Sequence, residues 1–249
     1  MFSGQFFPNQ PIQFGQWRHP RAGKDPYYSL VSLLLHCDGA DTTTTFTDNS
    51  PIGHTATALG NAQVDTAQSK FGGASCLMDG TGDGVRFADH ASFELGADDF
   101  TIEAWVRFAN VGAVRNLLTK FNTTGDQRSW LVQFQNVAVA LRITYSTDGA
   151  AGTTASKDFA WSPSIDTWYH VALVRVAGDL MAFIDGTQIG TTQSISGVTF
   201  FDGTANCVVG MNDNNGGPMN GWMDDVRLTK GLARYTANFT PHVAAHPDS

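Results

Sequence analysis

The acidic side chains are the first candidates for chemistry, and their types and spacing argue against a glycosidase. Glycoside hydrolysis uses a pair of carboxylates about 5 to 10 Å apart as acid, base or nucleophile. Of the 23 acidic residues only Glu94 and Glu103 are glutamates, and they lie far apart in the sequence. Glu103 is followed by Ala-Trp-Val-Arg, without a second acid two or four residues on. No strand offers two aspartates at alternating positions, so we predict that the chain is not an enzyme and has no catalytic residues.

Nucleophilic catalysis has no better support. A serine nucleophile needs a histidine base and often lies in a Gly-x-Ser-x-Gly turn, which this sequence does not contain. His170 has apolar neighbours and is expected to be a hydrogen-bonded residue of a strand. Cys37, Cys76 and Cys207 lack metal-ligand spacing and are expected to be buried thiols. The sequence leaves open whether Cys37 pairs with either of the other two.

Two loops rich in Asn, Asp and Gly form a candidate ligand site. They are segments 122–127 and 212–217, which follow expected strands, and their amide and carboxylate groups suit sugar hydroxyls. An aromatic side chain, Trp130 or Trp222, is expected to stack on the sugar ring. The candidate ligand-binding residues are Asp126, Trp130, Asn212, Asp213, Asn214 and Asn215. The alternative is that both loops are solvated turns, because these residue types tolerate left-handed backbone.

Composition excludes several classes of partner. The 249-residue chain has a net charge of −8, whereas nucleic-acid binding needs a basic surface. No apolar run approaches the ~18 residues of a membrane span, and the N-terminus lacks the apolar core of a secretion signal. We therefore expect a soluble protein made in the cytoplasm, with no nucleic-acid or membrane partner.

Residues 1–28 differ in composition from the rest of the chain. Their prolines exclude a helix and disfavour the interior of a sheet, and their aromatic residues are too numerous for a solvated linker. We expect an extended arm whose rings bury against a neighbouring subunit or, alternatively, against their own domain. The candidate anchoring residues are Phe2, Phe6, Phe7, Phe14, Trp17, Tyr27 and Tyr28.

From Leu30 onward the sequence is typical of strands joined by tight turns. Segment 99–109 alternates between apolar and polar side chains, which predicts a half-buried antiparallel strand. Asp185-Gly186 predicts a two-residue hairpin of type I′. Further strands are expected within 29–39, 62–80, 115–121, 130–135, 137–144, 168–176, 180–184, 187–193, 207–210 and 221–228. Strands at this spacing without helical periodicity predict an all-β jelly-roll sandwich.

Four motifs, in order and spacing, resemble those of the laminin-G-like, or concanavalin A-like, domains. They are SKFGGASCLMDGTGDGVRF, DFTIEAWVRF, TWYHVALVRVAGDLMAFIDGTQIG and VVGMNDNNGGPMNGWMDDVRL. The resemblance covers about residues 30–242, so we expect an arm at 1–28, a sandwich at 29–242 and a C-terminal tail at 243–249. The run GLARYTANFTP at 231–241 is similar to the version of this domain found in bacteriophage structural proteins.

The resemblance implies a non-enzymatic virion structural protein of a bacteriophage, either a capsid decoration protein or a tail- or fibre-associated one. Such a protein would be made in the host cytoplasm and displayed on the virion surface. Its arm would anchor it to other virion structural proteins, and a homo-oligomer is expected. The alternative is a carbohydrate-binding adhesion module that recognises host surface glycans, and a glycoside hydrolase is less favoured.

The resemblance also implies one structural calcium ion. In similar domains the ion joins an early Asp-containing turn to an aspartate of the last strand, and the matching residues here are Asp48 and Asp224. Calcium prefers carboxylate and carbonyl oxygens, which such turns supply. The alternative is that Asp48 closes an Asx turn and Asp224 pairs with Arg227 or with a backbone N–H. No other cofactor is expected.

Overall fold

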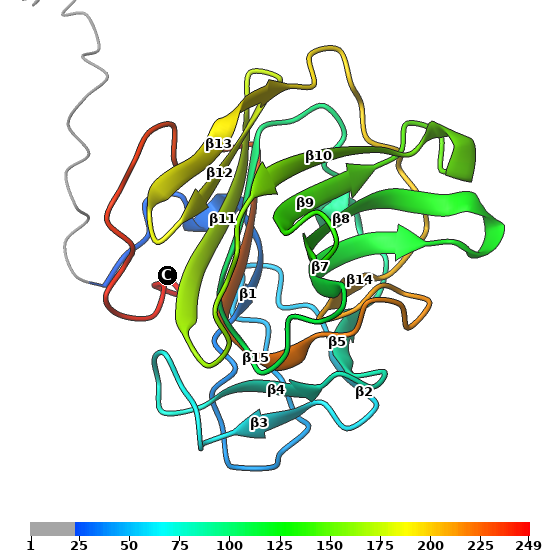
Figure 1. The fold of residues 1–249 in the computed structure, drawn as a ribbon. Helices are drawn as coiled ribbons and strands as arrows, with labels where there is room; N and C mark the ends of the chain where they lie inside the picture. The colour runs from blue at the N-terminus through cyan, green and yellow to red at the C-terminus, as the bar shows by residue number, and fades with distance from the viewer. Residues whose placement is uncertain (1–22) are drawn as a thin grey trace, which may run out of the picture.

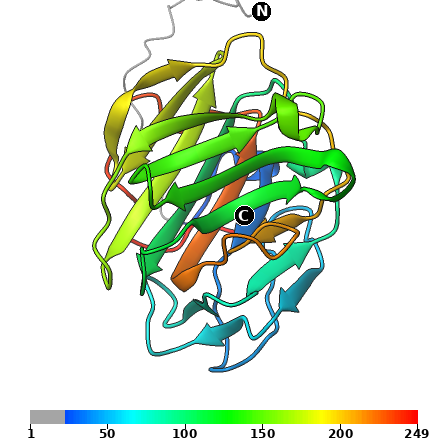
Figure 2. The same ribbon diagram turned by 45° about the vertical axis from the view of Figure 1, so that its right-hand side comes forward.

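Two antiparallel sheets lie face to face in this protein (Figure 1). The structure is a computed structural model that describes residues 23–249. Within this range fifteen strands form one sheet of eight strands and one of seven. Figure 2 shows the same two layers from a second direction. The predicted all-β sandwich is confirmed.

The eight-stranded sheet has the order β13-β12-β11-β6-β15-β4-β3, and β1 also pairs with β15. The long strand β15 pairs with β4 through its first residues and with β1 through its later ones, which gives both strands a place beside it. The strands are β1 (Val31–Leu35), β3 (Gln63–Asp65), β4 (Ser75–Asp79), β6 (Phe100–Phe108), β11 (Trp168–Val176), β12 (Asp179–Ile184), β13 (Thr187–Ser194) and β15 (Asn220–Lys230).

The seven-stranded sheet has the order β10-β9-β8-β7-β14-β5-β2. Its strands are β2 (Ala56–Leu59), β5 (Gly84–Phe87), β7 (Arg115–Asn122), β8 (Gln127–Gln135), β9 (Ala140–Tyr145), β10 (Ala155–Ala160) and β14 (Cys207–Val209). Sequence analysis did not separate out β2, β5 and β10, which are short or, in β10, largely exposed. The described chain also contains the short 3-10 helices η1 (Tyr28–Leu30), η2 (Ala91–Phe93), η3 (Thr124–Asp126) and η4 (Ala151–Thr153).

The main core lies between the sheets and is built by alternating residues of the strands. In β6 the inward residues Phe100, Ile102, Ala104, Val106 and Phe108 all belong to it, as the alternation predicts. The three cysteines are buried and free, and all three belong to this core. The Asp185-Gly186 hairpin is confirmed between β12 and β13, since both residues have positive φ angles of 49° and 76°.

The expectation that β6 is only half buried is wrong. Its outward residues Thr101, Glu103 and Trp105 are 0 to 5% exposed, because the C-terminal segment, residues 231–249, covers them. Oγ1 of Thr101 donates to the carbonyl of Leu232 at 3.0 Å. In Figure 1 this segment, drawn in red, runs along the outer side of the eight-stranded sheet. Alternation of apolar and polar residues shows that a strand has two different faces. It does not show whether another segment of the chain covers the polar face.

The C-terminal segment is held by a second, smaller hydrophobic cluster on the outer face of the eight-stranded sheet. Ala172, Val174, Met181 and Phe183 of β11 and β12 form this cluster. Tyr235 and Phe239 pack on it and stack on each other with ring centroids 3.6 Å apart. The similar run at 231–241 therefore serves, in this chain, to cover a sheet face.

A β-bulge in β15 changes which side chains point outward. The register with β6 shifts between Asp224, opposite Trp105, and Arg227, opposite Glu103. Asp225 has a φ of 50°, which non-glycine residues seldom adopt. Such a bulge inserts one residue and re-aims its side chain. Met223 and Val226 remain in the main core, and Asp225 bonds instead to the C-terminal segment.

The described part of the predicted arm packs on its own domain. Asp25 accepts hydrogen bonds from Arg227 and Arg234, and the Tyr28 hydroxyl donates to the Asn49 carbonyl at 2.5 Å. Tyr27 is more exposed, at 37%. Phe2, Phe6, Phe7, Phe14 and Trp17 lie outside the described residues.

The predicted C-terminal tail, 243–249, contacts the sandwich through buried His246. Its last residue, Ser249, accepts a backbone hydrogen bond from Asp25. Within residues 23–249 no helix is long and apolar enough to cross a bilayer.

Candidate functional site

A hollow of about 670 Å³ opens on the outer face of the eight-stranded sheet, beside the C-terminal segment. Segments far apart in the sequence form it: the β3–β4 connection, β6, the start of β11, the β12–β13 turn and the C-terminal segment. Its lining residues are Lys70, Phe71, Trp105, Trp168, Asp185, Pro241, His242 and Val243. Sequence analysis did not single out this set, because its members come together only when the sheet is covered.

Aromatic rings dominate one side of the hollow. Phe71 lies edge-on to Trp105, with ring centroids 5.9 Å apart, and Nζ of Lys70 is 3.6 Å from the Trp105 ring centre. The Trp105 indole N–H donates to Nε2 of His242 at 3.0 Å, which fixes the orientation of the indole. Trp168 contributes a half-buried indole. The hollow therefore presents rigid apolar surface.

Two side chains of opposite charge complete the lining. Asp185 is exposed, and its Oδ1 accepts the backbone N–H of His170 at 2.8 Å, which leaves Oδ2 free of bonds to the described residues. Partial burial lowers the pKa of Lys70, although the negative charges of Asp185 and Asp224 oppose this shift. The hollow thus combines aromatic surface with one carboxylate and one amine.

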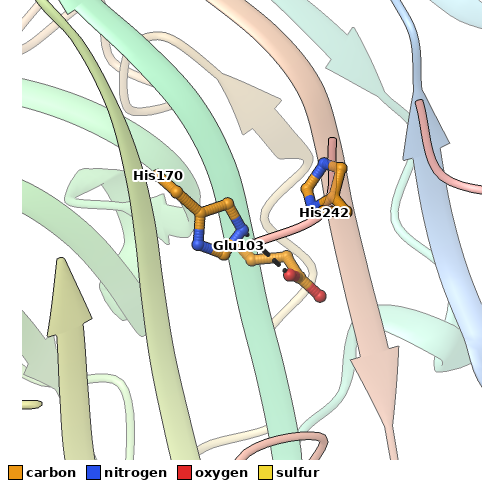
Figure 3. Close-up of side chains that lie close together, drawn as sticks. All are labelled: Glu103, His170 and His242. Carbon is orange, nitrogen blue, oxygen red and sulfur yellow. Dashed lines mark hydrogen bonds and ion pairs between the residues drawn. The ribbon is translucent and has the colours of Figure 1, made fainter. Parts of the chain in front are cut away.

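Beside the hollow lies a buried group of side chains that we call the histidine–carboxylate cluster. It comprises Glu103 on β6, His170 on β11, Asp225 on β15, and His242 and His246 on the C-terminal segment. Figure 3 shows Glu103, His170 and His242 gathered at one place from three parts of the chain. Nε2 of His170 is 3.2 Å from Oε2 of Glu103, so the expected hydrogen-bonded role of His170 in a strand is confirmed.

Burial and neighbouring side chains act in opposite directions on the pKa of both carboxyl groups. Burial opposes ionisation of Glu103, but the Arg227 guanidinium, which donates to Oε1 at 2.7 and 2.9 Å, holds its pKa well below the usual range. Burial likewise opposes ionisation of Asp225, but His246, His242 and His36 lower its pKa.

The two histidines of the C-terminal segment behave in the opposite way. Burial lowers the pKa of both His242 and His246. The negative charge of Asp225 opposes this shift in both histidines.

The cluster brings together two carboxylates that the sequence analysis did not pair. Glu103 and Asp225 come from different strands, and each lies within 4 Å of the same nitrogen, Nε2 of His246, at 3.8 and 3.6 Å. The spacing of acids within one strand does not reveal a pair that forms across β6 and β15. Both side chains are 0% exposed.

Trp130, predicted to stack on a sugar, is instead part of the main core. It is 0% exposed, and its indole N–H donates to the Phe93 carbonyl at 3.0 Å. A strand residue at the inward position of β8 cannot reach a ligand at the rim. Trp222, the other aromatic candidate, is half buried, lies under the guanidinium of Arg107 and donates to Asp65 at 2.6 Å.

The structure brings the two predicted rim loops together, but most of their polar side chains form hydrogen bonds within or between these loops. Oδ1 of Asn214 accepts the N–H and the hydroxyl of Thr123, and Nδ2 of Asn122 donates to Asp213 at 3.0 Å. Oδ1 of Asn212 closes the second loop by accepting two backbone N–H groups.

The remaining rim candidates fit turn chemistry. Asp126 pairs with Arg128 at 2.5 Å, and Asn215 has a left-handed backbone with a φ of 61°. Both Asp126 and Asn215 are exposed. These features agree with the turn alternative, and binding at the rim stays a prediction.

The two predicted calcium ligands lie in separate hydrogen-bond arrangements. Asp48 accepts the backbone N–H groups of Leu34, Ser50 and His54, as an Asx turn does. Oδ2 of Asp224 accepts the N–H groups of Lys70 and Phe71, and burial raises its pKa to about 7.

Neither Asp48 nor Asp224 belongs to a group of three or more metal-ligating side chains within residues 23–249. Their hydrogen bonds match the alternative weighed from the sequence, and calcium binding stays a prediction.

Comparison with solved structures shows the fold. The receptor binding domain of botulinum neurotoxin D matches with a TM-score of 0.60 and 15% identity, over 83% of this chain and 51% of that chain. The binding domain of Paraclostridial Mosquitocidal Protein 1 matches with a TM-score of 0.61 and 16% identity, over 83% of this chain and 50% of that chain.

A ligand binding domain of botulinum neurotoxin serotype D, in complex with N-acetylneuraminic acid, matches with a TM-score of 0.61 and 14% identity. The match covers 83% of this chain and 49% of that chain. Our chain therefore spans about half the length of these structures.

Comparison with known families shows which family the chain belongs to. No curated protein matches the chain. Residues 79–232 match the family Laminin_G_3, described as the concanavalin A-like lectin/glucanases superfamily. This region runs from the end of β4 to the segment after β15 and so includes most strands of both sheets. The chain belongs to the concanavalin A-like lectin/glucanases superfamily.

Proposed function

We propose that this domain is a non-enzymatic carbohydrate-binding module and that its hollow is the binding site. The observation that carries the proposal is the convergence of Phe71, Trp105 and Trp168 with Asp185 and Lys70 around one open concavity. Ligand sites are concave and mostly apolar, with a few polar groups that fix the ligand's orientation.

The chemistry of a sugar matches this lining. A pyranose has an apolar face of C–H groups, which suits a flat aromatic surface, and a rim of hydroxyls, which suits a carboxylate acceptor and an amine donor. Trp105 is only 5% exposed, so the half-buried Trp168 is the indole that a ligand can pack against. The amine of Lys70 would also favour an acidic sugar.

The structural neighbours support glycans as the ligand class. One is a ligand binding domain in complex with N-acetylneuraminic acid, and another belongs to a neurotoxin whose cell entry depends on two ganglioside molecules. At 14% identity these observations support the class of ligand and carry no residue over to this chain.

A glycan array followed by titration of the strongest ligand tests the proposal. Trp168→Ala is expected to weaken binding by about tenfold or more, as loss of a central aromatic contact does. Trp222→Ala is the matched control, because its indole lies on the same sheet but outside the hollow. Asn214→Ala tests the rim loops. Binding that survives Trp168→Ala and is lost with Asn214→Ala would move the site to the rim, and no binding to any glycan would overturn the proposal.

The virion structural role stays a prediction from the similar run at 231–241. A surface module that binds host glycans and an arm that anchors it to the particle are compatible in one chain. The anchoring test is deletion of residues 1–22, since Asp25 and Tyr28 contact the sandwich and must be kept. We expect a folded protein that no longer joins the assembly, and normal incorporation would show that the arm is not the anchor.

A further inference from the structure

The histidine–carboxylate cluster carries an inference that does not rest on glycan binding. Its side chains form two overlapping triads, Glu103 with His170 and His242, and Asp225 with His242 and His246. In each triad one ligand atom per residue lies within 4.8 Å of the others. Five potential ligands from three strands and the C-terminal segment therefore meet at one place.

The types of side chain select the class of ion. Imidazole nitrogens together with carboxylate oxygens suit zinc and neighbouring divalent transition metals, whereas calcium and magnesium prefer oxygen alone. A metal ion binds through the lone pair of an imidazole nitrogen and the oxygen of a carboxylate, and this cluster offers both kinds of group.

His246 provides the observation that hydrogen bonding alone does not explain. Its side chain is buried, and its Nε2 has no hydrogen-bond partner among residues 23–249. That nitrogen points between Oδ2 of Asp225, at 3.6 Å, and Oε2 of Glu103, at 3.8 Å. These distances are too long for hydrogen bonds. Two ligands on one tetrahedral zinc ion, each about 2.1 Å from it, lie about 3.4 Å apart.

His242 shows a related conflict. Its Nε2 is 3.0 Å from the Trp105 indole nitrogen, which can only donate, and 2.8 Å from Oδ2 of Asp225, which is ionised. An imidazole nitrogen carries either one lone pair or one proton, so Nε2 cannot accept from Trp105 and donate to Asp225 at the same time. A cation held between Nε2 and Oδ2 would use the lone pair of Nε2 and remove the mismatch at Asp225.

Neighbouring side chains orient the two carboxylates, as the outer contacts of metal sites usually do. Arg227 occupies Oε1 of Glu103, and Nδ1 of His36 lies 2.7 Å from Oδ1 of Asp225. Oε2 of Glu103 and Oδ2 of Asp225 face the imidazoles and also accept hydrogen bonds from the Tyr235 hydroxyl and the His246 backbone N–H, respectively. Outer contacts of this kind orient ligands and are a regular part of metal sites.

The geometry points to a binding site for one divalent transition-metal ion of the zinc type, held by Asp225, His242 and His246 with Glu103 and His170 beside them. The ion would join the bulge of β15 to the C-terminal segment. His242 also lines the hollow and is 19% exposed, so the site has a path to solvent. A bound ion would thereby fix one wall of the proposed glycan site.

The test uses the full chain without a histidine tag, stripped with a chelator and titrated with Co²⁺ and then Zn²⁺. We expect one Co²⁺ per chain with visible absorption bands, displaced by Zn²⁺, and a melting temperature that rises with metal concentration. His246→Gln is expected to weaken binding by at least about tenfold. The control is His54→Gln with His90→Gln, which removes an adjacent histidine pair outside the cluster, with ring centroids 4.9 Å apart.

The outcomes separate the metal site from a purely hydrogen-bonded contact. Absence of Co²⁺ binding by the wild-type chain, or loss of binding in the His54 and His90 control alone, would overturn the proposal. If His246→Gln does not fold, X-ray absorption of the Co²⁺ protein decides, because at least two imidazole ligands are expected and fewer would exclude the site. No glycan is present in these measurements, so their failure leaves the proposed function intact.

Discussion

The hydroxyl of Tyr235 donates to Oε2 of Glu103 at 2.8 Å, and this bond joins the C-terminal segment to the middle of the eight-stranded sheet. Glu103 also binds Arg227 through its other oxygen, and Arg227 in turn binds Asp25. One buried carboxylate therefore connects β6, β15 and both ends of the described chain. The proposed glycan site and the proposed metal site both lie against this network.

Replacement of Glu103 tests the energetic weight of the network. Glu103→Gln leaves the Arg227 guanidinium buried without its main partner, and we expect a loss of about 3 to 5 kcal/mol in the free energy of unfolding. The control is Asp158→Asn, which breaks the more exposed Arg142–Asp158 pair and should change stability by about 1 kcal/mol or less. Denaturant titration measures both, and equal midpoints would contradict the prediction.

Tyr235 allows the hydrogen bond and the ring to be tested separately. Tyr235→Phe removes only the bond to a charged acceptor and is expected to lower stability by about 1.5 to 3 kcal/mol. Tyr235→Ala also removes the stack on Phe239 and should expose residues 231–249 to faster amide hydrogen exchange. Unchanged exchange in Tyr235→Ala would show that the stack does not hold the segment.

Gly186 and Gly197 form a matched pair for testing how the C-terminal segment meets the β12–β13 turn. Both have left-handed backbones, with φ of 76° and 75°, so alanine is strained at either position. Only at Gly186 would the added Cβ lie 1.9 Å from the Phe239 carbonyl oxygen, whereas Gly197 has open space around it. Gly197→Ala should lower stability by the ~1 kcal/mol that backbone strain alone costs. Gly186→Ala should lower it by clearly more than that, because the clash is added to the strain. Thermal unfolding of both variants measures the difference.

Asp25 gives the network a predictable pH dependence. Burial raises its pKa, but the hydrogen bond and charge of Arg234, with Arg227, outweigh this and lower it below the usual 3.8. The unfolded chain then binds the proton first as the pH falls, so the stabilisation is present above pH 3.8 and is lost as the pH falls through the folded-state pKa.

Asp25→Asn should accordingly be less stable than the wild type at pH 7, and the difference should shrink below pH 3.8. Denaturant unfolding at several pH values measures it. A difference that stays constant with pH would assign the effect of Asp25 to packing rather than to its charge.

Most of the strands and the fold class follow from the sequence, because alternation and turn chemistry are local, whereas β2, β5 and β10 were not separated out. The inward residues of β6, the Asp185-Gly186 hairpin and the order of motifs all follow from neighbours within about ten residues. The same local reasoning placed Trp130 at a ligand site, since a tryptophan beside a polar loop looks alike whether it faces the core or the rim. Its burial depends on the opposite sheet, which no local pattern records.

The candidate sites depend on contacts between distant parts of the chain. Glu103 and Asp225 meet because a bulge in β15 turns an aspartate outward opposite β6, and the histidines arrive from a segment that has no regular structure of its own. The hollow likewise exists because residues 231–249 fold back over the sheet. Contacts between residues more than a hundred positions apart depend on how the whole chain packs, and the sequence order of these residues carries no sign of it.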